Sequence, residues 1–118
     1  MNLKFFSLSE FDCPSLPDSG KNMDTNFLYK LEHARDLAAI PFRITSGYRT
    51  TSHNEAVGGV PNSSHKIGVA ADIAVGSGSE RYIILNALIR AGFKRIGVAK
   101  TFIHCDTDES KPNSVWTY

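Results

Sequence analysis

One aspartate stands in the middle of an otherwise apolar segment, VAADIAV, at residues 69–75. A run of this length and composition predicts a β-strand, in which alternate side chains point to opposite faces. One face would carry Val69, Ala71, Ile73 and Val75, and the other Ala70, Asp72 and Ala74. Asp72 then lies between two alanines, whose small side chains leave room beside the carboxylate. We interpret that room as a site that suits a metal ion.

Two helices are predicted by apolar residues at helical spacing and by capping signals. The first covers residues 24–39, with Asp24 as its N-cap. The second covers residues 79–91, where Ser77 supplies a capping signal and Gly92 is suited to the position just after the helix. Each helix would turn one apolar stripe toward a core.

The remaining chain divides into further strands and polar connections. Strands are expected at FRITS, RIGVA and TFIHCD, residues 42–46, 95–99 and 101–106. GYRTTSHN (47–54) is expected to form a turn, and a loop rich in Gly, Pro, Asn and Ser is expected over 54–64. This order of elements predicts an α+β fold with helices packed on a small antiparallel sheet.

Length and charge limit the possible functions. The 118 residues predict a single domain, 1–118, and the 13 basic and 12 acidic residues are mixed along the chain, with a net charge of +1. Nothing in this pattern suggests a nucleic-acid surface, a membrane span or a signal peptide. We expect a monomer made in the cytoplasm, with Cys13 and Cys105 as reduced thiols.

Two histidines are candidates to join Asp72 at the metal. His65 precedes Asp72 by seven residues, and Gly68 would let the backbone curl so that both side chains reach one point. In FIHCD, strand alternation places His104 and Asp106 on one face. Two imidazoles and one carboxylate with an open fourth position are typical of catalytic zinc sites. The alternative for these residues is a hydrogen-bonded surface pair without metal.

Three stretches resemble one protein family. SSHKIGVAAD is similar to the Ser-x-His-x-x-Gly-x-Ala-x-Asp signature of the zinc D-Ala-D-Ala carboxypeptidase-like family, the M15 peptidases. SGYRT resembles the upstream Ser-Gly-Tyr-Arg element of that family, and FIHCD its downstream histidine strand. The resemblance runs from about residue 5 to residue 106, in the family's order, and is greatest to short single-domain members from phage and prophage genomes, the endolysin type.

The resemblance implies a role for each matching residue. One zinc ion would be held by His65, Asp72 and His104, within a Hedgehog/D-Ala-D-Ala carboxypeptidase-like fold. Arg49 would lie near the substrate carboxylate or the developing oxyanion, and its alternative role is a structural ion pair. Ser63 would line the site and contact substrate, or would only cap a turn.

One position departs from the family pattern. Many members carry Glu or Asp three residues before the last histidine, as general base, and here that residue is Thr101. Asp106 is the nearest replacement as a catalytic base, although it would equally serve to orient His104. Asp108 lies in a polar segment expected to be mobile, whereas Trp116 and Tyr118 would either edge a groove or pack across the sheet.

The resemblance leads to three functional hypotheses. The favoured one is a zinc peptidase that cuts peptidoglycan stem peptides, at a D-Ala-D-Ala or an L-Ala-D-Glu bond. The second is a zinc-containing, non-catalytic module that binds the cell wall or belongs to a virion, as the Hedgehog signalling domain resembles this family without clear peptidase activity. The third is a metal-free structural component. Under the first hypothesis the protein reaches the wall after release from the cytoplasm or as part of a virion.

Overall fold

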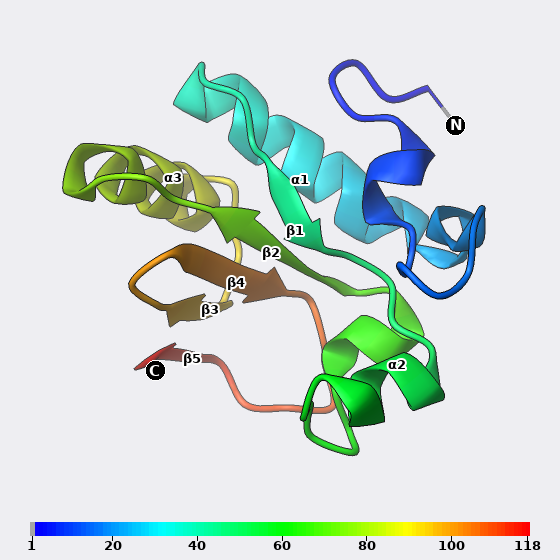
Figure 1. Ribbon diagram of the computed structural model, residues 1–118. Helices are drawn as coiled ribbons and strands as arrows, with labels where there is room; N and C mark the ends of the chain where they lie inside the picture. Colours follow the sequence, from blue (N-terminus) through cyan, green and yellow to red (C-terminus); the bar gives the residue numbers. More distant parts are fainter. Residues whose placement is uncertain (1) are drawn as a thin grey trace.

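Two helices cover one face of a five-stranded sheet in the computed structural model, which describes residues 2–118 (Figure 1). The helices are α1 (Thr25–Ala38) and α3 (Gly78–Arg90). The strands are β1 (Ile44–Ser46), β2 (Ala70–Ala74), β3 (Arg95–Val98), β4 (Phe102–Asp106) and β5 (Ser114–Thr117). Their order in the sheet is β1-β2-β4-β3-β5, and every neighbouring pair is antiparallel except β3 and β5. The predicted α+β class is confirmed.

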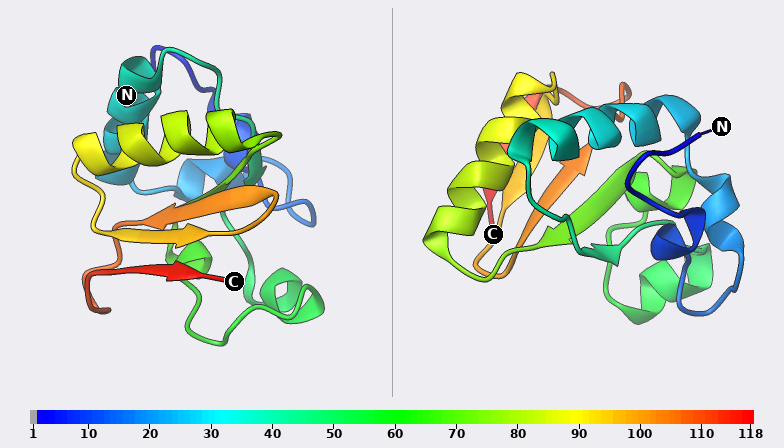
Figure 2. Two further views of the ribbon diagram at one scale, coloured as in Figure 1. Left: turned by 90° about the vertical axis from the view of Figure 1, so that its left-hand side faces the viewer. Right: turned by 90° about the horizontal axis from the view of Figure 1, so that it is seen from above.

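Both long helices begin where the sequence predicts. The Asp24 side chain accepts a hydrogen bond from the Phe27 backbone N–H, and the Ser77 side chain accepts one from Glu80. Each cap satisfies a backbone donor that the first helical turn leaves without a partner. After α3 the chain turns at Gly92, whose φ of +96° lies in the left-handed region. Figure 2 shows α1 and α3 packed against each other on the sheet.

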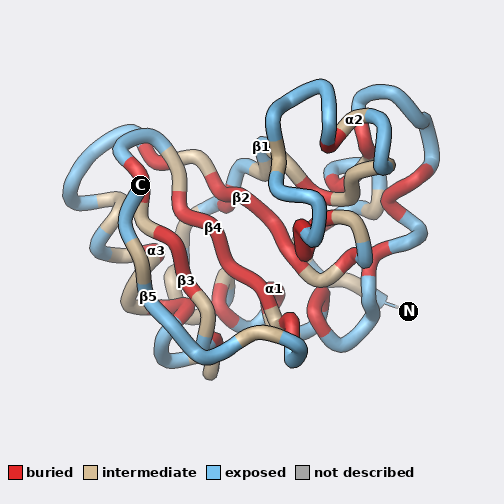
Figure 3. The backbone as a smooth tube through the Cα atoms, turned by 90° about the horizontal axis from the view of Figure 1, so that it is seen from below, coloured by how far each residue is buried: buried red, intermediate tan, exposed pale blue. Residues whose placement is uncertain are grey.

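The core lies between this helical layer and the sheet. Ala71 and Ile73 of β2 and Ile103 and Cys105 of β4 face it and are fully buried. Each buried Ile contributes about 1.5–3 kcal/mol relative to an exposed one. The predicted alternation is therefore confirmed, and it leaves the polar residues of β2 and β4 on the sheet face that α1 and α3 do not cover. Figure 3 views the molecule from below, with the strands in front.

Two elements differ from the sequence prediction. The segment expected as a turn contains a helix, α2 (Thr51–Ala56), which begins because the Thr50 side chain accepts a hydrogen bond from the His53 backbone. The tail, for which no strand was predicted, contains β5, which pairs with β3 in parallel. Its presence makes the sheet mixed, where a purely antiparallel one was expected.

Strand register aligns one row of residues across the sheet. Paired Cα positions connect Ser46, Asp72, His104, Gly97 and Trp116 in that order. Because side chains alternate with a period of two, register decides which face each of these residues occupies.

Among residues 2–118, no helix has the length and apolar character needed to cross a membrane.

Candidate metal centre and cleft

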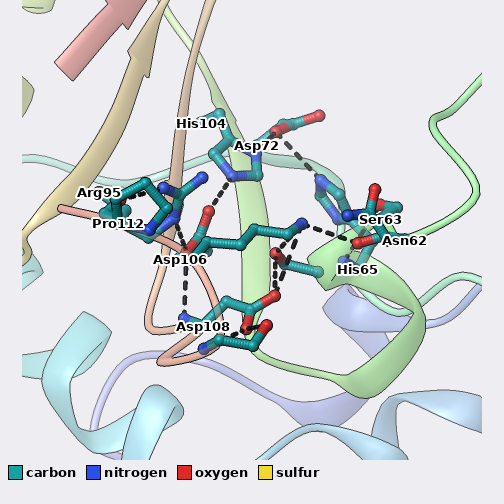
Figure 4. A network of polar contacts seen from close by, with 12 residues as sticks. Asn62, Ser63, His65, Asp72, Arg95, His104, Asp106, Asp108 and Pro112 are labelled. Atoms are coloured by element: carbon teal, nitrogen blue, oxygen red, sulfur yellow. Dashed lines mark hydrogen bonds and ion pairs between the residues drawn. The ribbon is translucent and has the colours of Figure 1, made fainter. Parts of the chain in front are cut away.

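Three side chains converge on the sheet face opposite the helices (Figure 4). One ligand atom from each of His65, Asp72 and His104 lies within 4.8 Å of the other two. Asp72 Oδ1 is 3.4 Å from His65 Nε2 and 3.0 Å from His104 Nδ1. The structure therefore brings together the three residues predicted from sequence. Their role as metal ligands stays a prediction.

His65 reaches this point from a tight turn, η3 (Ser64–Ile67). Gly68 ends the turn at a φ of +75°, and a Cβ there would lie 2.3 Å from the Asn22 carbonyl oxygen. The expected curl is present, and glycine is needed there because φ is positive and because a side chain would clash with Asn22. His65 Nδ1 lies 2.7 Å from the Gly47 carbonyl oxygen. Because a carbonyl only accepts, Nδ1 donates a hydrogen bond to Gly47, and Nε2 is the ring nitrogen that faces Asp72.

His104 lies between two carboxylates. Its Nδ1 contacts Asp72, and its Nε2 is 2.7 Å from Asp106 Oδ2. Burial alone would lower the pKa of His104, but hydrogen bonds and charge from Asp106 and Asp72 outweigh burial and raise it. Burial would raise the pKa of Asp72, but hydrogen bonds from His104 and His65 lower it well below its usual range. The site thus favours a cation beside an ionised Asp72.

The donor set fits zinc. Two imidazole nitrogens and one carboxylate oxygen are typical zinc ligands, and three protein ligands leave one position open. Histidines that bind zinc usually donate their other N–H to a carbonyl or a carboxylate, which fixes the ring orientation. Gly47 provides the carbonyl for His65, and Asp106 provides the carboxylate for His104.

Asp106 is held on both carboxylate oxygens. Arg95 Nε donates to its Oδ1 at 2.8 Å, and the Asp108 backbone N–H donates to the same atom at 3.0 Å. Oδ2 faces His104, and the residue is 1% exposed. Burial would raise the pKa of Asp106, but the hydrogen bonds from His104 and the Asp108 backbone, together with the charges of His104 and Arg95, outweigh burial and lower this pKa. These contacts favour the orienting role, and the catalytic role of Asp106 stays a prediction.

Arg49 and Ser63 lie beside the three converging side chains. Arg49 Nη2 is 3.6 Å from Asp72 Oδ2, while Nε donates to Ser46 Oγ and Nη1 to Asn54 Oδ1. These contacts fix the plane of the guanidinium. Ser63 caps η3, since its Oγ accepts a hydrogen bond from the His65 backbone at 3.3 Å, and it also lines the cleft. Capping and contact with substrate are therefore compatible for Ser63.

A cleft of about 400 Å³ opens above the three converging side chains. Arg49 and the loop after α2, with Val57 and Val60, lie on its lining. Aromatic side chains of β4, β5 and the residue after β5 also line it, namely Phe102, Trp116 and Tyr118. Trp116 and Tyr118 border this cleft. The sequence had left two positions possible for them, the edge of a groove or packing across the sheet.

A family model of peptidase M15 matches residues 5–106. The match covers α1, α2, α3 and strands β1 to β4, and it contains all three converging side chains. The chain belongs to the peptidase M15 family. The resemblance expected from sequence is thereby confirmed, and the chain is a peptidase by family. M15 peptidases are in general zinc-dependent. A comparison with curated proteins found no match.

This M15 peptidase has a second polar network that sequence reasoning missed. Asp108 was expected in a mobile segment, but it is 6% exposed and accepts a hydrogen bond from Ser64 Oγ at 2.7 Å. Lys111 Nζ lies 3.5 Å from Asp108 Oδ2 and donates to the Asn62 carbonyl oxygen at 2.7 Å. The network joins the loop after β4 to the turn that carries His65. No local sequence signal indicates this contact, because its partners are 44 residues apart.

Replacing Asp106 by asparagine in this M15 peptidase is expected to weaken zinc binding about 10- to 100-fold, because asparagine removes the charge that orients His104. Titration against a competing chelator measures the change. Asp36→Asn, at an exposed position on α1, is the control and should bind zinc normally. If Asp106→Asn kept its zinc affinity but lost hydrolysis, Asp106 would have a role in proton transfer.

Replacing Asp108 by asparagine is expected to lower the free energy of unfolding by about 1–2 kcal/mol at pH 7. Burial alone would raise the pKa of Asp108, but hydrogen bonds from Ser110 and Ser64 outweigh it and lower this pKa to about 2. The unfolded value is about 3.9. Since the native pKa is the lower one, the carboxylate stabilises the fold above about pH 4, and this contribution is lost as the pH falls toward about 2.

Urea unfolding of the metal-free protein at several pH values measures this effect. The difference between wild type and Asp108→Asn should shrink as the pH falls from about 4 to about 2. The exposed Asp18→Asn variant should match wild type at each pH. A difference of the same size at pH 7 and pH 2 would contradict the assigned role of the Asp108 charge.

Proposed function

We propose that this protein is a zinc-dependent peptidase that hydrolyses an amide bond in peptidoglycan stem peptides, either D-Ala-D-Ala or L-Ala-D-Glu. The observation that supports it most is the convergence of His65, Asp72 and His104 within 4.8 Å beneath an open cleft. Membership of the M15 family adds independent support for the peptidase activity.

Each residue of the centre has a role in this proposal. His65, Asp72 and His104 hold the zinc ion, and Asp106 keeps the His104 ring oriented. When bound, zinc lowers the pKa of a coordinated water molecule to about 7 and polarises the scissile carbonyl. Arg49 presents a fixed, planar cation at the cleft, which suits a substrate carboxylate or the charge that develops on the carbonyl oxygen.

The cleft supports a short peptide as substrate. Its volume of about 400 Å³ is in the range of small-molecule sites, and it accommodates a few residues of an extended chain. The cationic side chains Arg49, Arg95 and Lys111 contribute to its lining. Stem peptides carry free carboxylates, so their charge complements that lining. We propose that the protein acts as a monomer on the wall, after release from the cytoplasm or as a virion component.

One observation favours a second candidate, a zinc-containing module that binds the wall without cutting it. Thr101 replaces the acidic base of many relatives, and it is exposed in the turn before β4. Within residues 2–118, the carboxylates that line the cleft are Asp72 and Asp106, and both are engaged by other side chains. Under this candidate the protein binds sacculi and releases no product.

Digestion of purified sacculi, followed by mass spectrometry of the muropeptides, tests the proposal. We expect new peptide termini at one bond with the zinc-loaded wild type, and none after chelation or with His65→Ala. The mass of the products identifies the bond. If sacculi bind the zinc-loaded protein but no new terminus forms, the binding module is the correct function.

A further inference from the structure

The aromatic wall of the cleft is built around Trp116, which lies in the same row of the sheet as Asp72 and His104. The Trp116 and His104 rings have centroids 5.4 Å apart and are tilted by 47°. The Arg95 guanidinium carbon lies 4.9 Å from the centroid of the indole. Trp116 remains partly exposed and lines the cleft, so one part of its surface is available to a bound molecule.

Gly97 makes this position of the indole possible. It lies on β3 between His104 and Trp116 in the row of paired residues. A Cβ at Gly97 would be 2.5 Å from Trp116 Nε1 and 2.6 Å from Trp116 Cε2, which is closer than non-bonded atoms approach. The missing side chain therefore lets the indole lie across β3 toward His104.

The aromatic wall differs in chemistry from the Arg49 part of the cleft. Phe102 and Tyr118 extend it, with their ring centroids 5.1 Å apart. Arg49, in contrast, presents a guanidinium next to Asp72. Consecutive residues of a peptide are about 3.8 Å apart. A peptide whose scissile bond lies at the three converging side chains would therefore place a neighbouring residue within reach of the indole.

We infer that Trp116, with Phe102 and Tyr118, forms a subsite for the small apolar side chain of the residue next to the scissile bond, and that Gly97 positions the indole there. The inference rests on the proposed function. It concerns a strand that lies beyond the family match, which ends at residue 106. In stem peptides the occupant is the methyl group of an alanine, and the indole determines preference for alanine over glycine.

Binding of paired peptides to the zinc-loaded protein tests the subsite. The probes are L-Lys-D-Ala-D-Ala and L-Ala-γ-D-Glu-L-Lys. For each alanine in a probe, a counterpart peptide carries glycine at that position. In every peptide a ketomethylene group replaces the D-Ala-D-Ala or Ala-Glu amide, so that the bond is not hydrolysed during the measurement. Calorimetry should show about fourfold tighter binding of one alanine peptide than of its glycine counterpart, the effect of burying one methyl-sized group. The ratio of the alanine to the glycine affinity should fall to about one in Trp116→Ala and in Gly97→Ala, whereas it should stay near fourfold in Trp116→Phe.

Fluorescence gives a second measurement at the same residue. Trp116 is the single tryptophan of the chain, so the intrinsic tryptophan emission reports on this wall alone. The bound alanine peptide should shift or quench the emission of wild type. Zinc binding, measured by chelator competition, should be unchanged in Gly97→Ala, because the Cβ added there meets the indole first.

The outcomes separate this inference from the proposed function. A preference for alanine that persists in both Trp116→Ala and Gly97→Ala would overturn the subsite, and so would unchanged Trp116 emission at saturating peptide. Failure of both alanine peptides to bind would also overturn it. Hydrolysis of sacculi by wild type is measured separately, so the peptidase proposal stands or falls on that result.

Discussion

Replacing His65 or His104 by alanine is expected to abolish both zinc binding and peptide hydrolysis. Each variant leaves two protein ligands, and two ligands do not hold zinc in a catalytic site. Loss of the metal removes about 4 kcal/mol or more of transition-state stabilisation, so kcat/KM should fall at least about 1,000-fold. In wild type, zinc at about 100 times its Kd should raise Tm by roughly 10 °C, and neither variant should respond.

Elemental analysis of the purified proteins measures zinc per chain, and thermal unfolding with and without zinc measures the response. His33→Ala is the matched control, because His33 is exposed on α1 and lies away from the cleft. It should keep one zinc per chain and full activity. One tightly bound zinc in either His65→Ala or His104→Ala would show that the ligand assignment is wrong.

Replacing Arg49 by alanine is expected to lower kcat/KM by about 100- to 1,000-fold, the effect of removing a fixed donor from an oxyanion site. Three contacts, to Ser46, Asn54 and Asp72, hold the guanidinium in place before substrate arrives. Arg49→Lys keeps the charge but loses the planar fork, so it should recover only part of the activity. Steady-state kinetics on the peptide identified from sacculi provide the measurement.

The division between kcat and KM separates the possible roles of Arg49. A fall mainly in kcat indicates stabilisation of the transition state, whereas a rise in KM alone indicates binding of a substrate carboxylate. Arg43→Ala removes one exposed positive charge elsewhere and should leave both constants unchanged. Unchanged kcat/KM in a folded Arg49→Ala protein that holds zinc would make the contact with Asp72 purely structural.

The strands and helices with strong periodicity were predictable from sequence. Alternation in VAADIAV and FIHCD placed Asp72 and His104 on the face away from the core, because the period of two leaves each residue only two directions. The caps Asp24 and Ser77 marked the starts of α1 and α3. Gly68 indicated the curl that carries His65 to the site. Local sequence signals, namely strand alternation, helix caps and one glycine, thus predicted most of the candidate metal centre.

Elements that depend on distant partners were not predictable in this way. Helix α2 has six residues, too few for a periodic pattern, and its buried Asn54 bonds to the carbonyl of Val60 and to Arg49. Strand β5 is short, largely exposed and paired in parallel with a strand that ends sixteen residues before it begins. Neither segment has a composition that separates it from a loop.

The Asp108 network shows the same limit at the level of a single side chain. A polar run from residue 107 to 113 is typical of an exposed loop. Asp108 accepts hydrogen bonds from its neighbour Ser110 and from the distant Ser64, and Lys111 provides a counter-charge. The contact with Ser64, which buries Asp108 against the turn that carries His65, depends on the tertiary fold and could not be predicted from the sequence alone.

The row of paired residues from Ser46 to Trp116 gives the candidate metal centre a further property. Its members come from five strands, so a shift of any strand by one residue would turn that strand's contribution away from the cleft. A sheet in which β2 or β4 is misregistered would retain much of its secondary structure but would turn a proposed zinc ligand, Asp72 or His104, away from the cleft. Under the proposed function, zinc affinity is therefore an assay of the register of β2 and β4, and it would distinguish native refolded material from compact misfolded forms that circular dichroism would not separate.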